Sequence, residues 1–201
     1  MTAASQALEF SVLTAGETGA ALEDLARLRI AVFAAWPYLY EGDASYERGY
    51  LARFAASPGA VIVAARDAEG RMLGAATAAP LADHAQDFAA PFARAGLDPK
   101  EFFYLAESVL LPEFRGQGAG RRFFEMREAA ARAQGFSRAV FAAVERPADH
   151  PARPAHYLPL DAFWLRLGYR PFEGLKAAFS WRDIGEAGES VKPLQVWGKA
   201  L

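Results

Sequence analysis

The sequence contains no cysteine, which excludes disulfide bonds, thiolate metal sites and a cysteine nucleophile. Its only histidines, His84, His150 and His156, are too widely spaced to predict a metal site. No stretch approaches the roughly 20 consecutive apolar residues that a membrane-spanning helix needs. The N-terminus also lacks the basic start and apolar run of a secretion signal. We therefore expect a cytoplasmic protein that does not associate with membranes.

The chain also lacks a strong charge of either sign, with a formal net charge of -2 at pH 7. Such a chain has no overall field that would attract nucleic acid or an anionic membrane, so any phosphate binding must be local. Its 201 residues, 53% of them hydrophobic and 23% charged, fit one compact domain with a buried core. We expect a single domain over residues 1–201.

Hydrophobic periodicity predicts an alternation of strands and helices. Turn-like residues at 67–70 separate two short apolar runs and favour an antiparallel hairpin. Pro91 is expected to interrupt the third helix. The expected strands cover residues 8–13, 60–65, 72–79, 102–111, 137–144, 175–181 and 191–197, and the expected helices cover 20–33, 43–56, 83–95, 119–135 and 161–167.

A glycine-rich segment joins the strand expected at 102–111 to the helix that follows it. It reads Arg115-Gly116-Gln117-Gly118-Ala119-Gly120. Backbone N–H groups in the first turn of a helix have no partner within the helix, and glycine lets a phosphate approach them. The cationic Arg121 and Arg122 would each cost about 0.3 to 1 kcal/mol at this position unless an anion lies nearby. The segment therefore predicts a site for a phosphate or diphosphate.

The residues around these glycines limit the identity of the ligand. A P-loop needs Gly-Lys followed by Ser or Thr, whereas Arg121 and Arg122 follow Gly120 here. A dinucleotide fingerprint starting at Gly116 would need a glycine at position 121. Glu145, after the next strand, could still imitate the ribose-binding acid, so a nucleotide-dependent oxidoreductase stays an alternative.

The glycine segment resembles the Gln/Arg-x-x-Gly-x-Gly/Ala motif of the GNAT N-acetyltransferase superfamily, at Arg115, Gly118 and Gly120. The later run Phe-Trp-Leu-Arg-Leu-Gly-Tyr at 163–169 is similar to the family's Leu-Tyr-x-x-x-Gly-Phe segment. The resemblance implies an α/β (α+β) fold with a mixed, mostly antiparallel central sheet and helices on both faces. It also implies acetyl-CoA or a related acyl-CoA as the co-substrate, and we expect no metal ion to take part.

The resemblance places the CoA contacts along the same stretch. In the family, backbone groups near the end of the fourth strand bind the pantetheine arm, which implies contacts at Ser108, Val109 and Leu110. The side chains of these residues fit an ordinary apolar strand equally well. The family's loop amides hold the pyrophosphate, which implies contacts at Arg115, Gly116, Gln117, Gly118, Ala119, Gly120 and Arg121.

Acyl transfer to an amine needs a base that removes the proton of the amine. By simple alternation, Phe103, Leu105, Glu107, Val109 and Leu111 share one face of their strand, with Glu107 alone among apolar neighbours. Desolvation makes a carboxylate more basic. Many members of the family carry a glutamate base at this place, so Glu107 is our candidate. The alternative is a buried glutamate that pairs with an arginine for structure.

The proton donor departs from the family pattern. The usual tyrosine falls at Trp164, and an indole N–H cannot replace a phenol as an acid. Tyr157 is our candidate donor, followed by His156, and both lie on the proline-rich loop at 145–159. Direct release of the thiolate to solvent is the remaining alternative.

The acceptor is expected at an aromatic loop between the first two helices. In proteins of this resemblance that region covers the acceptor, and aromatic rings bind a cation or an apolar body. The candidate contacts are Trp36, Tyr38, Tyr40 and Glu41, although the rings also fit a purely structural role. We expect a small-molecule amine or a peptide N-terminus as the acceptor.

These observations predict an acyl-CoA-dependent N-acetyltransferase that works by direct attack of a primary amine. The departure at Trp164 keeps a second hypothesis open, a CoA-binding sensor without catalysis. The sequence leaves open whether the chain forms a homodimer.

Overall fold

The computed structural model describes residues 7–201, apart from the side chains of residues 85–89. Its sheet has the strand order β1-β2-β3-β4-β5-β7-β6. Only β4 and β5 pair in parallel, and every other neighbouring pair is antiparallel. The strands are β1 Glu9–Val12, β2 Val61–Arg66, β3 Met72–Pro80, β4 Phe103–Leu110, β5 Arg138–Val144, β6 Arg170–Trp181 and β7 Ser190–Ala200. The predicted mixed, mostly antiparallel sheet is confirmed.

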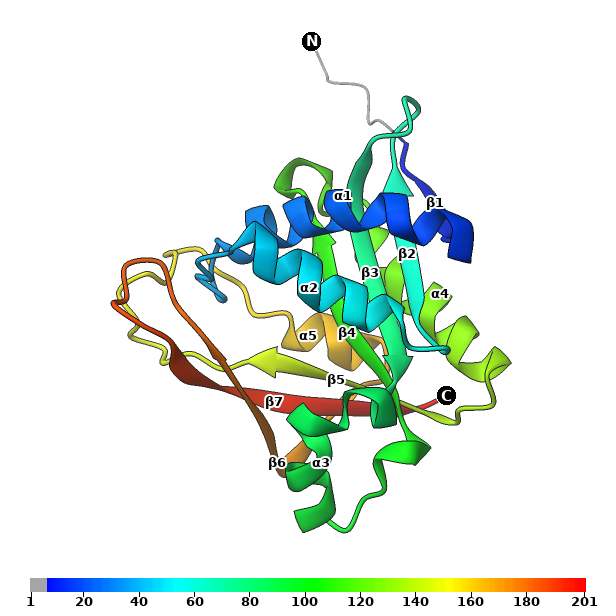
Figure 1. The fold of residues 1–201 in the computed structure, drawn as a ribbon. Helices are drawn as coiled ribbons and strands as arrows, with labels where there is room; N and C mark the ends of the chain where they lie inside the picture. Colours follow the sequence, from blue (N-terminus) through cyan, green and yellow to red (C-terminus); the bar gives the residue numbers. More distant parts are fainter. Residues whose placement is uncertain (1–6) are drawn as a thin grey trace.

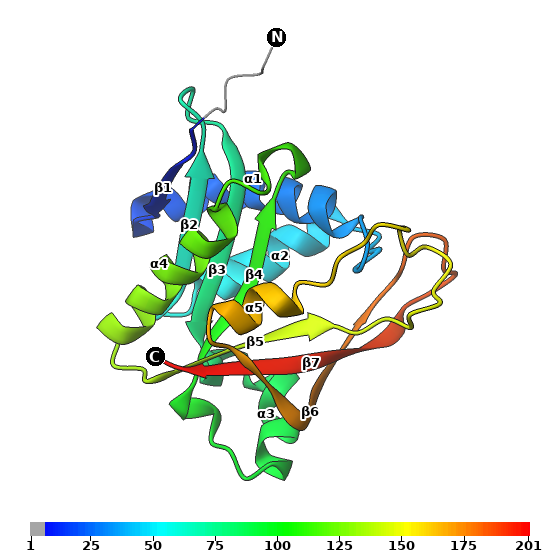
Figure 2. The ribbon, with the colours of Figure 1, turned by 180° about the vertical axis from the view of Figure 1, so that it is seen from behind.

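Helices cover both faces of this sheet, as the sequence predicts (Figures 1 and 2). Two of them, α1 and α2, lie on one face, and α4 and α5 lie on the other. The Asp43 side chain begins α2 by accepting a hydrogen bond from the backbone N–H of Tyr46 at 2.7 Å. The helices are α1 Ala15–Phe33, α2 Ala44–Ala55, α3 Ala85–Arg94, α4 Ala119–Ala133 and α5 Asp161–Arg166. Pro91 lies inside α3, so the predicted interruption at this residue is wrong.

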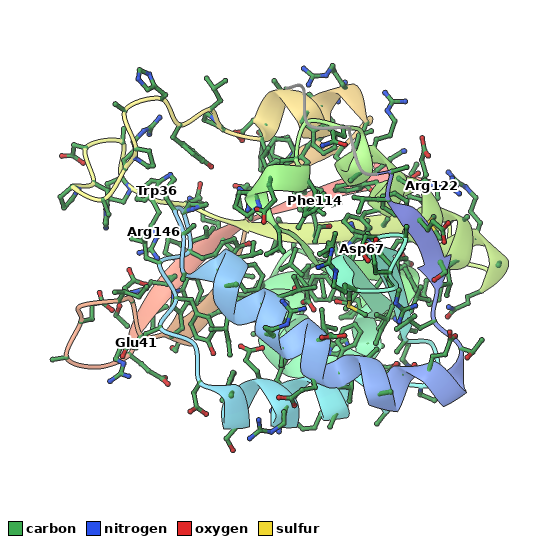
Figure 3. The ribbon with its side chains drawn as sticks, turned by 90° about the horizontal axis from the view of Figure 1, so that it is seen from above. Trp36, Glu41, Asp67, Phe114, Arg122 and Arg146 are labelled. Atoms are coloured by element: carbon green, nitrogen blue, oxygen red, sulfur yellow. The ribbon has the colours of Figure 1, made fainter. Side chains whose placement is uncertain are left out.

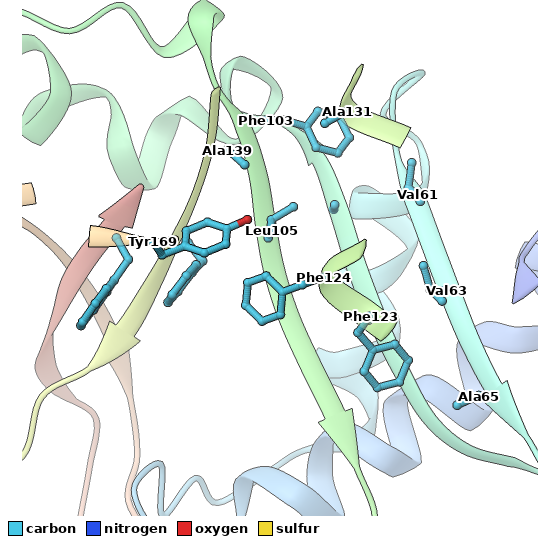
Figure 4. Close-up of a cluster of buried hydrophobic side chains, with 14 residues drawn as sticks. Val61, Val63, Ala65, Phe103, Leu105, Phe123, Phe124, Ala131, Ala139 and Tyr169 are labelled. Carbon is cyan, nitrogen blue, oxygen red and sulfur yellow. The ribbon is translucent and has the colours of Figure 1, made fainter. Parts of the chain in front are cut away.

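A separate apolar cluster lies between each face of the sheet and its helices. On the α4 face, Phe123 and Phe124 of the helix pack against Phe103 and Leu105 of β4 (Figure 4). On the α1 face, Leu25 and Leu28 belong to a cluster that includes Val109 of the same strand. The side chains of β4 therefore contribute to both cores.

A β-bulge explains why β4 changes face. In the pairing of β3 with β4, Ala78 lies opposite Leu105 and Thr77 lies opposite Glu107, so Ala106 has no partner. The extra residue reverses the alternation of the side chains that follow it. The predicted common face of Phe103, Leu105, Glu107 and Val109 is therefore wrong. Phe103 and Leu105 face α4, whereas Glu107 and Val109 face α1.

Arg127 of α4 fills the space beside this bulge. Its side chain is 1% exposed, and its Nη1 donates to the carbonyl oxygens of Glu107 at 2.9 Å and Thr77 at 3.1 Å. Its Nη2 donates to the Ser108 hydroxyl at 2.8 Å. Burial lowers the pKa of Arg127 to about 10, so the guanidinium remains charged at neutral pH. One buried cation thus satisfies carbonyl groups on both strands of the irregular pair.

We predict that Arg127→Met lowers the free energy of unfolding by about 3 kcal/mol, because it leaves two buried carbonyl groups without donors. Urea denaturation followed by circular dichroism measures this change. Arg132→Met is the matched control on the same helix, since Arg132 is half exposed and its ion pair with Glu128 is 3.5 Å long. The control should cost less than about 0.5 kcal/mol. Equal costs for the two variants would contradict the role given to Arg127.

Candidate functional site

The glycine segment forms the entry to α4. Gly116 has φ 77° and Gly118, the N-cap residue, has φ 84°. A Cβ at either position would meet no atom within 4 Å, so close packing does not require glycine here. Glycine is favoured because both residues adopt a left-handed backbone conformation. Within the described chain, no side chain caps α4 and no acidic residue stands in its first turn. The first N–H groups of the helix are therefore available to an anion.

The other predicted residues of this segment have different environments. A Cβ at Gly120 would lie 3.4 Å from Cζ of Phe163, so α5 packs directly against the start of α4. Arg115 turns back toward β4, where its Nε donates to the carbonyl of Leu110 at 3.1 Å. Arg121 is exposed beside the helix terminus, Gln117 is exposed and Ala119 is buried. Most of the predicted anion contacts thus surround the start of α4.

The strands β4 and β5 pair only at their beginnings. The paired residues are Phe103 with Ala139 and Tyr104 with Val140, after which β5 continues in its pairing with β7. The two strands diverge beyond this point, as Figure 2 shows. Ser108, Val109 and Leu110 lie on the diverged part of β4, whose edge toward β5 has no ladder partner in the described chain. A strand edge of this kind can bind an extended ligand through backbone groups.

Glu107 lies at the same part of β4, on the face toward α1. Its Oε2 is 2.8 Å from Nη1 of Arg29, and Arg29 also pairs with Glu47 of α2. All three side chains are nearly buried, with exposures of 5% for Glu107, 11% for Arg29 and 0% for Glu47. The second oxygen of Glu107, Oε1, is buried and has no hydrogen-bond partner among the described residues. An unpartnered buried carboxylate oxygen is costly unless a ligand or water completes it.

The guanidinium of Arg29, which pairs with both carboxylates, lies against two aromatic rings. Its guanidinium carbon is 4.6 Å from the ring centre of Tyr50 and 5.1 Å from that of Phe33. Burial alone would lower the pKa of Arg29, but the carboxylate of Glu107 raises it above its ordinary value. Arg29 therefore stays charged, and Glu107 is held by an arginine as the structural alternative expected. Its free oxygen still leaves it available to a ligand.

The aromatic loop reaches this carboxylate through Tyr38. Burial, and then the charge of Glu107, raise the pKa of Tyr38 to about 12, and Tyr157 contributes to the same shift. Trp36 stands at 5.8 Å from Tyr157 and at 5.0 Å from His150, measured between ring centres. The structure thus brings together Glu107, Tyr38, Trp36 and Tyr157, which come from three separate parts of the sequence.

The remaining predicted residues lie to the side of this group. Burial and a hydrogen bond to Glu47 raise the pKa of Tyr40. Glu41 is about half exposed and pairs with Arg182 at 2.9 Å. His156 is exposed. Trp164, at the place of the family's usual tyrosine, packs on Phe141 and Trp197 with ring centres 5.0 Å and 5.2 Å away. The indole of Trp164 is therefore part of the hydrophobic packing on this face of the sheet.

Arg146 fixes the aromatic loop and was not found by sequence reasoning. It follows β5 and donates to the carbonyl oxygens of Pro37 at 2.8 Å and Tyr38 at 2.6 Å. Its guanidinium also makes two bonds to Asp183, at 2.6 Å and 2.9 Å. Figure 3 shows Arg146 beside Trp36 at one end of the molecule. Its side chain is 8% exposed, so the loop is attached by a buried clamp.

The backbone of the same loop is strained at one residue. Leu39 has φ 56°, a left-handed conformation that costs a non-glycine residue roughly 1 to 2 kcal/mol. Hydrogen bonds on both sides compensate for it. Trp181 Nε1 donates to the Tyr38 carbonyl at 3.1 Å, and the Ile184 N–H donates to the Leu39 carbonyl at 2.7 Å. The loop that presents Trp36 and Tyr38 is therefore preformed.

The described residues contain neither a metal-binding group nor a membrane span. Among the side chains that the structure describes, no group of three His, Asp or Glu residues is arranged to hold a metal ion. None of the helices within residues 7–201 combines the length and the apolar composition that crossing a lipid bilayer requires.

Comparison with known proteins identifies the type of domain. A model of the acetyltransferase (GNAT) family matches residues 25–158, which include β4, the glycine segment and α4. No curated protein matches the sequence.

Solved structures give the same fold at low sequence identity. A GCN5-related N-acetyltransferase from Kribbella flavida superposes with a TM-score of 0.57 and 19% identity, covering 97% of this chain and 98% of that chain. An aminoglycoside 6'-N-acetyltransferase complexed with coenzyme A gives 0.61 and 16%, covering 96% of each chain. An acetyltransferase of the GNAT family from Staphylococcus aureus Mu50 gives 0.58 and 8%, covering 97% of this chain and 99% of that chain.

We predict that Arg146→Met loosens the aromatic loop without unfolding the protein. Hydrogen exchange measured by mass spectrometry should show the amides of residues 38–41 exchanging about tenfold faster, because the bonds to two loop carbonyls are lost. Arg182→Met is the control, since it removes only the half-exposed ion pair with Glu41. Unchanged exchange in the Arg146 variant would show that the loop does not depend on the clamp.

Proposed function

The chain belongs to the GNAT acetyltransferase family, and from this premise we propose that it transfers an acyl group from acetyl-CoA or a related acyl-CoA to a primary amine. The observation that carries the proposal is the free, buried oxygen of Glu107 beside the diverging edge of β4. A base and a binding edge for an extended thioester thus lie on one short stretch of strand.

The residues present fit a CoA thioester. The left-handed Gly116 and Gly118 expose the uncapped start of α4 to a diphosphate, and Arg121 supplies positive charge beside it. The unpaired edge at Ser108, Val109 and Leu110 suits the amide groups of a pantetheine arm. When bound, acetyl-CoA supplies the activated acyl group. The chain binds and orients that group through backbone atoms.

Glu107 acts as the base. An amine arriving as an ammonium ion gives a proton to Oε1, and its nitrogen then forms the new N–C bond as the C–S bond breaks. The departing sulfur takes a proton from Tyr157, and the second proton of the nitrogen restores the Tyr157 phenol. Glu107 then returns the first proton to solvent. The products are an N-acylated amine and a free thiol, with one proton released overall. Arg29 keeps Glu107 in place through Oε2 during these steps.

Tyr157 supplies the proton to the sulfur. It lies against Trp36 and contributes to the electrostatic environment of Tyr38, next to Glu107. Burial raises the pKa of Tyr157, so the phenol keeps its proton at neutral pH and can donate it. Trp36, Tyr38 and Tyr40 surround the acceptor, and Glu41 stands at the outer side of the loop.

We predict that Glu107→Gln lowers kcat by about 10²- to 10⁴-fold, because the amide cannot accept the proton. The dissociation constant for acetyl-CoA, measured by calorimetry, should stay unchanged. Glu128→Gln is the matched control, since Glu128 is a buried carboxylate that binds Tyr169 and Lys199 on the other face of the sheet. Full turnover in the Glu107 variant would refute its role as the base. Binding of acetyl-CoA without acylation of any amine by the wild type would favour the sensor hypothesis.

We predict that Tyr157→Phe lowers kcat throughout pH 7 to 9 and leaves the affinity for acetyl-CoA intact. The pKa of Tyr157 lies above the ordinary tyrosine value of about 10, so in the wild type this phenol stays protonated over that range. Its loss should therefore lower the rate without adding a new limb to the pH–rate profile. Tyr46→Phe, at a ring that is 56% exposed, is the control. If Tyr157→Phe changes neither rate nor profile, the thiolate leaves to solvent without this donor.

A further inference from the structure

The charges around the aromatic loop are almost fully paired. At Arg29, two carboxylates and one guanidinium leave a single net negative charge. Glu107 and Glu47 share this charge, and each keeps one buried oxygen, Oε1, without a hydrogen-bond partner among the described residues. Behind the loop, Asp183 binds Arg146 at 2.6 Å and Lys192 at 3.2 Å. Lys192 also binds Glu186 at 3.0 Å, so these two acids and two bases sum to zero. The buried groups thus offer one net negative charge to an acceptor.

The carboxylates at the rim are also neutralised or solvated. Glu41 pairs with Arg182 at 2.9 Å, and Glu145 pairs with Lys176 at 2.6 Å. Asp149 and Asp161 are exposed on the neighbouring loop and helix, where water and salt screen their charge. A second ammonium group on the acceptor would therefore find no second uncompensated negative charge among the described buried groups. Bringing such a charge into partly buried surroundings without a partner is costly.

The surface next to the single charge is aromatic. Tyr38 lies between Phe33, at 4.5 Å, and Trp181, at 6.1 Å, measured between ring centres. Trp36 and Tyr157 stand edge to face on the side of the proline-rich loop. The Nε1 of Trp36 is buried and has no acceptor among the described residues, so it offers one hydrogen-bond donor. Rings of this kind bind apolar or aromatic bodies, and the preformed loop keeps the cost of ordering them low.

We propose that the acceptor is a small monoamine, with one ammonium group at Glu107 Oε1 and an aromatic or other apolar body against Trp36, Tyr38 and Tyr157. This proposal rests on the proposed N-acyl transfer and names its substrate class. It predicts that amines with several positive charges are poor acceptors, because each additional ammonium group needs its own uncompensated negative charge. It also assigns the aromatic loop to specificity rather than to catalysis.

The test compares amines that differ by one feature, with acetyl-CoA saturating and thiol release and N-acetyl product both measured. Hexylamine and 1,6-diaminohexane differ by one terminal ammonium group, and kcat/KM should be at least about tenfold higher for hexylamine. 2-Phenylethylamine should exceed methylamine by at least about tenfold, since only the former fills the aromatic surface. A tripeptide with a free N-terminus and an aminoglycoside complete the panel and should both be poor acceptors.

A substitution in the aromatic loop tests whether the preference for an amine with an apolar body depends on that loop. Trp36→Ala should reduce the ratio of kcat/KM between 2-phenylethylamine and methylamine by about tenfold, because the edge of the apolar surface is lost. Tyr46→Ala removes an exposed ring of α2 and should leave the ratio unchanged. Because the readout is a ratio measured on one protein sample, a loss of folded enzyme in either variant does not alter it.

Each outcome has a separate meaning. Equal or better use of 1,6-diaminohexane, the tripeptide or the aminoglycoside overturns the monoamine proposal while leaving N-acyl transfer intact. An unchanged ratio in Trp36→Ala overturns the assignment of the loop to specificity. If no amine of the panel is acylated although acetyl-CoA binds, the proposed function itself fails.

Discussion

The contact between Arg127 and the bulge of β4 is the interaction on which the site depends. The extra residue, Ala106, turns Glu107 away from α4 and toward Arg29. The same irregular stretch follows directly after the last residues that pair with β5. Arg127 supplies donors to the carbonyl groups on both strands, from a position that water does not reach. Arg127 thereby stabilises a distortion of the sheet that places Glu107, the proposed base, beside the open strand edge.

The two sides of the proposed site, for CoA and for the acceptor, are built by different physical means. The CoA side uses backbone: left-handed glycines, an uncapped helix terminus and an unpaired strand edge. These features depend little on the side chains of the segment. The acceptor side uses buried ion pairs, in which Arg29 fixes Glu107 and Arg146 fixes the aromatic loop. We infer that recognition of the acceptor depends on long-range contacts and that recognition of the acyl donor depends on local backbone geometry.

This difference explains what could be predicted from the sequence. The strands, the capping of α2 by Asp43 and the glycine segment follow from local patterns, and the structure agrees with them. The face of Glu107 was misjudged, because a single unpaired residue reverses the alternation and leaves no local signal. Arg29 and Arg146 were missed, since each is an ordinary arginine until the fold brings its partners from distant segments. An arginine one turn before the end of α1, on an otherwise apolar helix face, could have drawn attention to Arg29.

We propose that an amine attacks the acyl carbon of the bound thioester directly, with Glu107 as the base. A rapid-quench single turnover, with enzyme in excess over radiolabelled acetyl-CoA, tests it most directly. After mixing with hexylamine, we expect N-acetylated amine and free CoA to form together at one rate, with no labelled enzyme and little free acetate. Intact acetyl-CoA that remains bound, or acetate released without N-acetylated amine, would contradict the claim.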